Sequence, residues 1–373
     1  MIDLELYEKL RRLLRGGLPK HDVTYRLVSN MYPEEEAKIL VSSIKRTGKP
    51  ISFDEIAKQS DVQGDKLKEI LNNMVSKGKL LRAGPMYILL PYLPGGFEVY
   101  FTNSTDDPER LKKVAIAHQQ LFKMGMPLEL STSKYPVYRV IPAIKPTKKI
   151  IELNEELDVQ HQIMPYEILK KYLAEANPKI YAVVKCSCRV AAGLAGEPCK
   201  QTDENYCVAT GILAQRVLKQ ENAREVSLDE LMEVMEKAEK EGLVHETINT
   251  QDTAMFVCNC CSCCCGFLKS VKELSNYGSI TKSNFDPQIE RDLCTLCESC
   301  MEICPMNAIY HHWPHRSDHS DDFMNIRLEL CIGCGICASN CPSEAISLKK
   351  VRNIEPVKNQ LEMSVKRREE RAH

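Results

Sequence analysis

Short amphipathic segments separated by polar breaks make up the first hundred residues. Apolar side chains at helical spacing predict helices over 4–14, 33–44 and 65–76. A capping box, Ser52-x-x-Glu55, predicts a further short helix over 53–59. Extended apolar runs at 80–81 and 86–90 flank Ala-Gly-Pro and predict a β-hairpin. The region is therefore expected to contain helices followed by a hairpin.

This order is similar to a winged-helix domain, which we predict for residues 1–100. The exposed positions of the 65–76 helix mix acidic and basic side chains and include no arginine, a residue that often contacts guanine. A helix that reads DNA should instead carry a basic stripe. A docking or scaffold module is therefore favoured, and nucleic acid is an unlikely partner.

Residues 101–180 have weaker patterns and are interpreted as a connector. An edge strand is expected at 97–101, where apolar residues alternate. A second edge strand is expected at 135–144, because Pro136 and Pro142 break this run and cannot donate to a neighbouring strand. Apolar periodicity and prolines at their starts predict helices over 108–124 and 165–176. The single histidines His118 and His161 are interpreted as surface residues.

Eight cysteines near the C-terminus repeat one spacing twice. C-x2-C-x2-C-x3-C-P runs from Cys294 to Pro305 and again from Cys331 to Pro342. This is the ligand signature of a bacterial two-cluster ferredoxin. Zinc is disfavoured, because a zinc site needs one tetrahedral group rather than an interleaved pair. We therefore assign residues 284–350 to a ferredoxin domain with two [4Fe-4S] clusters.

The spacing also predicts which thiols share a cluster. Three thiolates two residues apart can reach three irons of one cubane, whereas the fourth, before a proline, turns away toward the other cluster. The predicted ligand sets are Cys294, Cys297, Cys300 and Cys341 for one cluster, and Cys331, Cys334, Cys337 and Cys304 for the other. Short strands are expected after each Cys-Pro, from Asn307 and from Glu344.

Ten further cysteines lie in residues 181–283, a predicted cysteine-rich module. They match no regular ferredoxin spacing: Cys186, Cys188, Cys199, Cys207, Cys258, Cys260, Cys261, Cys263, Cys264 and Cys265. The first four suffice for one [4Fe-4S] cluster, and the last six provide thiols for another. Three alternatives remain open: one or two further clusters, which is favoured; a cluster or zinc site with a redox-active thiol; or buried cysteines without a metal.

Other features of this module bear on its ligands. Adjacent residues of a strand point to opposite faces, so Cys260 and Cys261 should serve different sites. A capped amphipathic helix is expected over 227–241, after a strand at 180–184. His245, shortly before the second group of cysteines, is a less favoured candidate for a ligand or a proton-transfer group.

Composition excludes some classes of protein. The 373 residues include 18 cysteines, and their spacings indicate metal ligands rather than a disulfide framework. The N-terminus lacks the pattern of a signal peptide, and no apolar run is long enough for a membrane span, so a reducing, cytoplasmic location and an anaerobic host are expected. The formal net charge of −1 gives no general attraction to nucleic acid or anionic lipid. No dinucleotide fingerprint or P-loop is present.

Taken together, these motifs resemble a family of 4Fe-4S dicluster-domain proteins of anaerobes with an N-terminal winged-helix-like region. The resemblance rests on Cys186-Ser187-Cys188-Arg189, Gly196-Glu197-Pro198-Cys199, Gly242-Leu243-Val244-His245, the 258–265 segment and the ferredoxin motifs. It implies cluster binding and electron transfer but no substrate. The chain departs from a minimal ferredoxin in the histidine-rich link at 310–319, which is interpreted as a solvated insertion or partner-docking loop rather than a metal site.

The predicted fold class is α+β with several domains, ending in a charged tail at 351–373 that is expected to be a frayed terminal helix or disordered. The favoured function is an electron-transfer protein or subunit that relays single electrons to or from a redox partner protein. One alternative is an iron–sulfur oxidoreductase with its active site at Cys258–Cys265. The other is a redox-sensing winged-helix regulator.

Overall fold

The computed structural model describes residues 3–15, 18–103, 105–153, 163–202, 206–219, 223–252, 255–314 and 319–372. His161 lies outside these residues. The chain forms two compact units: the N-terminal unit contains Met1–Leu130 and Lys185–Cys199, and the C-terminal unit contains Ser131–Val184 and Lys200–His373. The five-segment division drawn from the sequence remains a prediction.

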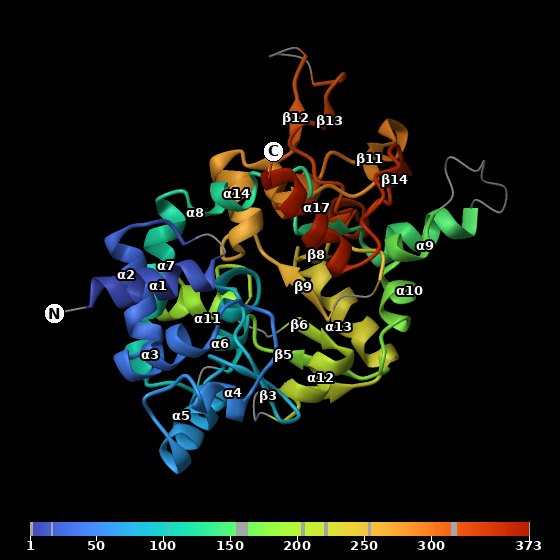
Figure 1. Ribbon diagram of the computed structural model, residues 1–373. Coiled ribbons are helices and arrows are strands. Elements are labelled where there is room, and N and C mark those ends of the chain that lie inside the picture. The colour runs from blue at the N-terminus through green and yellow to red at the C-terminus, as the bar shows by residue number, and fades with distance from the viewer. Residues whose placement is uncertain are drawn as a thin grey trace. The chain divides into compact units, whose positions relative to one another are not determined.

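Helices dominate the N-terminal unit (Figure 1). They are α1 (Leu4–Leu14), α2 (Asp22–Met31), α3 (Glu34–Ser43), α4 (Phe53–Ala57), α5 (Gly64–Ser76), α6 (Phe97–Asn103), α7 (Pro108–Lys123), α8 (Met126–Leu130) and α11 (Ser187–Leu194). A small sheet has the order β1 (Ile51–Ser52), β3 (Met86–Ile88), β2 (Leu81–Ala83). The predicted helices, the Ser52–Glu55 capping box and the hairpin are all present. The assignment to the winged-helix fold stays a prediction.

Several helices of this unit differ from the sequence prediction, and α8 and α11 are among those that were not predicted. Helix α2 was not predicted; its N-cap is His21, whose Nδ1 accepts a hydrogen bond from Val23 N, and histidine is an uncommon cap. The strand expected at 97–101 is wrong, because the segment forms α6. The spacing of its aromatic residues fits both the repeat of a strand and the repeat of a helix. Phe97, Tyr100 and Phe101 are all buried, however, which is the i, i+3, i+4 pattern of one helix face.

His118 is buried, so its interpretation as a surface residue is wrong. On α7 its ring stacks on Phe97 with a centroid distance of 4.2 Å. Its Nδ1 lies 2.8 Å from the hydroxyl of Tyr92. The flanking polar residues suggested exposure, but the position belongs to the buried face that also contains Val114, Ala115 and Leu121. His118 is therefore part of the aromatic core of this unit.

This burial predicts a pH-dependent stability. Desolvation lowers the pKa of His118 to about 3, whereas a histidine in an unfolded chain has a pKa of about 6.5. The unfolded chain then binds the extra proton, so stability is full above about pH 6.5 and falls as the pH drops toward 3. Between pH 7 and 5.5 the N-terminal unit should lose about 1 kcal/mol of unfolding free energy. Anaerobic hydrogen exchange of its amides measures this loss.

The matched comparison is His118→Gln, which keeps a polar side chain but does not titrate. This variant should lose most of the pH dependence between pH 7 and 5.5, whatever its absolute stability. The exposed His21 provides a control, because His21→Asn keeps an acceptor at the cap of α2 and should leave the pH dependence of the unfolding free energy unchanged. If His118→Gln keeps the pH dependence of the parent, the prediction is contradicted.

A seven-stranded sheet forms the centre of the C-terminal unit (Figure 1). Its order is β10 (Ile280–Thr281), β4 (Tyr138–Ile141), β8 (Val244–Ile248), β9 (Phe256–Cys260), β6 (Cys207–Thr210), β5 (Tyr181–Val184), β7 (Ala223–Val226). Only β10 and β4 pair in parallel; the other neighbours are antiparallel. The helices of this unit that precede the ferredoxin-type region are α9 (Ile144–Leu153), α10 (Leu169–Ala174), α12 (Gly211–Val217), α13 (Leu228–Lys240) and α14 (Gly266–Leu274).

Strand β4 is an interior strand, which corrects the expectation of an edge. It pairs with both β8 and β10, and all four of its residues are buried. Pro136 and Pro142 lie just outside the strand, so every residue within it keeps an N–H group for pairing. The predicted helix α13 is confirmed, with the capping box Ser227–Glu230 and a buried stripe that includes Leu231 and Met235.

The ferredoxin-type region belongs to the same unit. It consists of two antiparallel strand pairs and two short helices: β11 (Phe285–Ile289) with β14 (Ile346–Lys350), β12 (Ile309–His312) with β13 (Phe323–Ile326), α15 (Ser299–Ile303) and α16 (Ile336–Ser339). The strands expected after each Cys-Pro are β12 and β14. Asn307 and Glu344 take the same left-handed conformation before them, with φ of 52° and 53°. The two motifs are thus a structural repeat.

The charged tail ends in a helix, which was one of the two expected forms, but this helix is anchored rather than frayed. It forms α17 (Gln360–Ala372), which buries Met363 and whose Glu370 accepts hydrogen bonds from Ser133 Oγ and Lys134 N. These partners are more than 230 residues away in sequence, which is why the charge pattern alone did not reveal them. Among the described residues, no helix combines the length and the apolar character that a membrane-spanning segment requires.

Candidate metal centres

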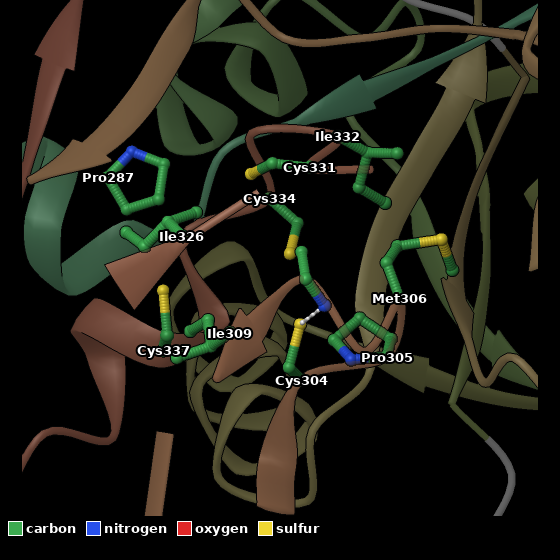
Figure 2. A pocket seen from close by; sticks show the side chains of 12 residues that line it. Pro287, Cys304, Pro305, Met306, Ile309, Ile326, Cys331, Ile332, Cys334 and Cys337 are labelled. Carbon is green, nitrogen blue, oxygen red and sulfur yellow. Dashed lines mark hydrogen bonds between the residues drawn. The ribbon is translucent and has the colours of Figure 1, made fainter. Parts of the chain in front are cut away.

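Two hollows in the ferredoxin-type region are each lined by four cysteines. Cys294, Cys297, Cys300 and Cys341 line the first, of about 310 Å³. Cys304, Cys331, Cys334 and Cys337 line the second, of about 350 Å³. Figure 2 shows the sulfur atoms of the second set around a common space. In both hollows the fourth thiol comes from the other motif. We call them the first and second cysteine hollows.

Left-handed turns shape both cysteine loops. Gly333 and Gly335 have φ of 70° and 75°, and the equivalent residues Leu296 and Glu298 have φ of 56° and 60°. These turns let backbone N–H groups approach the thiols. The amide of Gly333 lies 3.4 Å from Cys331 Sγ. The amide of Ala308 lies 3.3 Å from Cys304 Sγ, as drawn in Figure 2. Such N–H···S contacts stabilise thiolate ligands and tune cluster potentials.

The two hollows differ in exposure. Cys331, Cys334 and Cys337 of the second hollow are all buried, whereas Cys297 of the first is exposed. Burial raises the pKa of these three buried thiols. Hydrogen bonds from the side chain and backbone of Ser299 lower the pKa of Cys297. The buried thiols therefore become thiolates at neutral pH only when a cation such as iron binds them.

The donor sets fit [4Fe-4S] clusters. Each hollow offers four thiols and a lining that is otherwise largely apolar, including Met306, Ile309 and Ile332 in the second. In the second hollow the amides of Ala308 and Gly333 point at the sulfurs of Cys304 and Cys331. Four thiolates in an apolar, amide-lined pocket are the usual environment of such a cluster. The groups that would hold each cluster are therefore the two sets of four cysteines.

The cysteines of the upstream module divide among several places. Cys186, Cys188 and Cys199 belong to the N-terminal unit, whereas Cys207, at the start of β6, belongs to the C-terminal unit. Their assignment to one shared cluster remains a prediction. The six others lie on β9 and on the turn between β9 and α14. In that turn, the Sγ atoms of Cys261, Cys263 and Cys264 lie within 4.8 Å of one another.

A second group joins two cysteines to an acidic residue that the sequence did not suggest. One ligand atom from each of Glu246, Cys260 and Cys265 lies within 4.8 Å of the other two. Cys260, the last residue of β9, and Cys261, the first residue after it, thus belong to different groups. Glu246 was missed because it lies on β8. Only the pairing of β8 with β9, which sets Glu246 opposite Cys258, brings it to the thiols.

Glu246 is an unusual carboxylate. It is 1% exposed, its Oε2 lies 3.6 Å from Cys265 Sγ, and its Oε1 has no hydrogen-bond partner among the described residues. Burial, together with the nearby Cys258, raises the pKa of Glu246 to about 8, although contacts with Cys260 and Cys265 act in the opposite direction. A buried carboxylate oxygen without a partner is costly, so this group is a candidate for a functional role.

Hydrogen bonds connect the second motif to the cysteine-bearing strand. Glu239 on α13 accepts from Ser339 Oγ of α16 at 2.6 Å and lies 2.9 Å from His245 Nε2. His245 Nδ1 in turn contacts Asn259 Oδ1 on β9, at 2.5 Å. The structure therefore gives His245 a role in positioning β9. Both ring nitrogens of His245 have partners within the protein, and a role as a ligand or proton-transfer group stays a prediction.

The second hollow and the Glu246 group share one apolar core. Cys260 and Cys265 pack in the same cluster of buried side chains as Cys331 and Cys334, together with Leu268, Val271, Ile332 and Ile336. The backbone N–H of Ala143, just after β4, also donates to Cys334 O at 2.9 Å. The more deeply buried cysteine hollow therefore adjoins the central sheet and its cysteine-rich turn.

The histidine-rich link at 310–319 begins within β12, which pairs with β13 beyond the link, and its residues 315–318 lie outside the described part. His311 Nδ1 lies 2.6 Å from Glu298 Oε1, and its Nε2 lies 3.3 Å from Asp322 Oδ2. Trp313 is 59% exposed at the end of β12. The interpretation of this link as an insertion or a docking loop stays a prediction.

Comparison with known proteins places residues 293–346 in the 4Fe-4S dicluster domain family. The pyruvate synthase subunit PorD of Methanothermobacter marburgensis is 33% identical over 66 residues, which are 18% of this chain and 68% of that protein. An uncharacterized ferredoxin of Methanocaldococcus jannaschii is 32% identical over 96 residues, 25% of this chain and 51% of the relative. Hydrogenase-4 component A of Escherichia coli is 30% identical over 99 residues, 26% of this chain and 44% of the relative.

The chain thus spans about half the length of the last two relatives. The matched residues contain both cysteine motifs and both hollows. The family match, the paired motifs and the ferredoxin relatives agree with one another. This chain belongs to the family of ferredoxin-type proteins with a 4Fe-4S dicluster domain.

Proposed function

We propose that this protein relays single electrons through two [4Fe-4S] clusters in its C-terminal region. The ligands are Cys294, Cys297, Cys300 and Cys341 for the first cluster, and Cys304, Cys331, Cys334 and Cys337 for the second. The observation that carries the proposal is the interleaving of the two motifs, since each hollow is lined by three thiols of one motif and one of the other. Bound clusters would supply the one-electron chemistry.

Exposure suggests the order of transfer. The first cluster lies at the surface beside the exposed Cys297, so it is the exchange point with a partner protein. The second lies in the core shared with Cys260 and Cys265, so it leads toward the upstream module. That module binds one or two further metal centres. The relatives named as subunits of pyruvate synthase and hydrogenase-4 favour a role as an electron-transfer component of a larger oxidoreductase system, in the cytoplasm of an anaerobe.

Metal analysis of anaerobically purified protein tests the proposal. The two clusters should contribute eight irons and eight acid-labile sulfides per chain, and the dithionite-reduced protein should give the EPR signal of two interacting clusters. The double variant Cys294→Ala/Cys331→Ala should lose about eight irons relative to the parent. A colourless protein without labile sulfide, or unchanged iron in the double variant, contradicts the proposed function.

A further inference from the structure

We propose that Glu246, Cys260 and Cys265 bind one divalent transition-metal ion in the C-terminal unit, at a site separate from the ferredoxin clusters. Two thiolates and one carboxylate are donors that zinc accepts, and iron(II) accepts the same set. The residues come from β8, from the end of β9 and from the cap of α14. The proposal does not depend on the electron-transfer function.

The size of the group indicates a single ion. A Zn–S bond of about 2.3 Å and a Zn–O bond of about 2.0 Å, set at tetrahedral angles, place a sulfur and an oxygen ligand about 3.5 Å apart and two sulfur ligands about 3.8 Å apart. Cys265 Sγ and Glu246 Oε2 lie 3.6 Å apart, and all three ligand atoms fall within 4.8 Å. A cubane would hold its ligands farther apart, because each thiolate binds a different iron. The compact group therefore matches one tetrahedral ion rather than a third [4Fe-4S] cluster.

The buried carboxylate provides a second, independent observation. Glu246 is 1% exposed, and its Oε1 has no hydrogen-bond partner among the described residues. An unpaired carboxylate oxygen in an apolar core is destabilising unless a cation or a donor satisfies it. A metal ion at the position shared with Cys260 and Cys265 supplies that charge. It also makes thiolates of two buried thiols.

Three protein ligands leave a fourth position, for which Cys258 is a candidate, although its thiol is outside the compact group of three ligand atoms. Cys258 is the cross-strand partner of Glu246 and shares a face of β9 with Cys260. The thiol of Cys260 contacts those of both Cys258 and Cys265. A fourth thiolate closes a structural site, whereas a water leaves an exchangeable one. The number of sulfur neighbours around the metal separates these two forms of the site.

Zinc loading tests the site. Anaerobically purified parent and variants are incubated with Zn²⁺ and desalted, and then zinc, iron and labile sulfide are measured per chain. Cys260→Ala should bind about one metal ion fewer than the parent, with no loss of sulfide. Glu246→Gln, which keeps the shape of the side chain, should release zinc to a chelator about 10-fold faster or more. Zinc-edge X-ray absorption should show one oxygen ligand fewer at this site.

Two controls make the result specific. Glu167→Gln alters another buried carboxylate of the same unit, one that pairs with Lys350, and it should leave the zinc count unchanged. Cys304→Ala should lose iron and sulfide but keep this zinc, which separates the site from the ferredoxin clusters. The proposal is overturned if Cys260→Ala loses about four irons together with sulfide, or if zinc release is unaltered in Glu246→Gln. The second measurement stands even if Cys260→Ala fails to fold.

Discussion

Replacing Cys304 with alanine should remove the cluster of the second motif and leave that of its own motif in place. Cys304 lines the hollow of Cys331, Cys334 and Cys337, so its loss takes away one of four thiolates there. About four irons and four sulfides per chain should disappear. The signal from interaction between the two clusters should also vanish from the EPR spectrum of the reduced protein.

Pairs of substitutions identify which cluster is lost. Cys304→Ala/Cys334→Ala should lose no more iron than Cys304→Ala alone, because both residues line one hollow. Cys304→Ala/Cys300→Ala should lose about eight irons, because Cys300 lines the other hollow. Non-additivity within one site and additivity between two sites is the expected pattern. The reverse pattern would show that each motif ligates its own cluster and would refute the crossed assignment.

Gly333→Ala should destabilise the C-terminal unit by more than about 3 kcal/mol, and the variant should no longer bind the second cluster. Gly333 has φ of 70°, and a Cβ there would lie 2.2 Å from Phe285 O and 2.3 Å from Ser283 Oγ. Ser283 cannot easily move, because its hydroxyl also donates to Gly333 O at 2.6 Å. The loop must therefore shift, and Cys331 and Cys334 shift with it. Anaerobic thermal unfolding and iron content measure the two effects.

Two other glycines calibrate this expectation. At Gly335, with φ of 75°, the nearest atom to a new Cβ is the flexible end of Leu348 at 2.8 Å, so Gly335→Ala should cost less. At Gly48, with φ of 77°, no atom lies within 4 Å of the new Cβ, so Gly48→Ala should cost only about 1 kcal/mol of backbone strain. If Gly333→Ala is as mild as Gly48→Ala, close packing of the cysteine loop is not what requires this glycine.

Several features could be predicted from sequence because they depend on neighbours along the chain. The capping boxes at Ser52 and Ser227 mark helix starts that the structure contains. The C-x2-C-x2-C-x3-C-P spacing predicts a short loop with three convergent thiols and a fourth directed elsewhere. In both cases the residues that interact lie within about one or two turns of each other.

Other features escaped prediction because they depend on distant partners. The alternation at 97–101 fits a strand, but packing of three aromatic residues favours a helix. His118 has polar neighbours in sequence and aromatic neighbours in space. Strand β4 is flanked by prolines, yet β8 and β10 pair with its two sides. Each error has the same origin, since a local pattern was compatible with two structures and tertiary contacts selected one.

The chemistry of the ferredoxin-type region can be predicted from its eight cysteines alone, because their spacing restricts which metal centre they can ligate. The grouping of the other cysteines, and the place of Glu246 beside two of them, depends on the fold instead. The pairing of β8 with β9 brings this carboxylate to Cys260 and Cys265. No spacing along the chain encodes that meeting, because hydrogen bonding between two strands creates it.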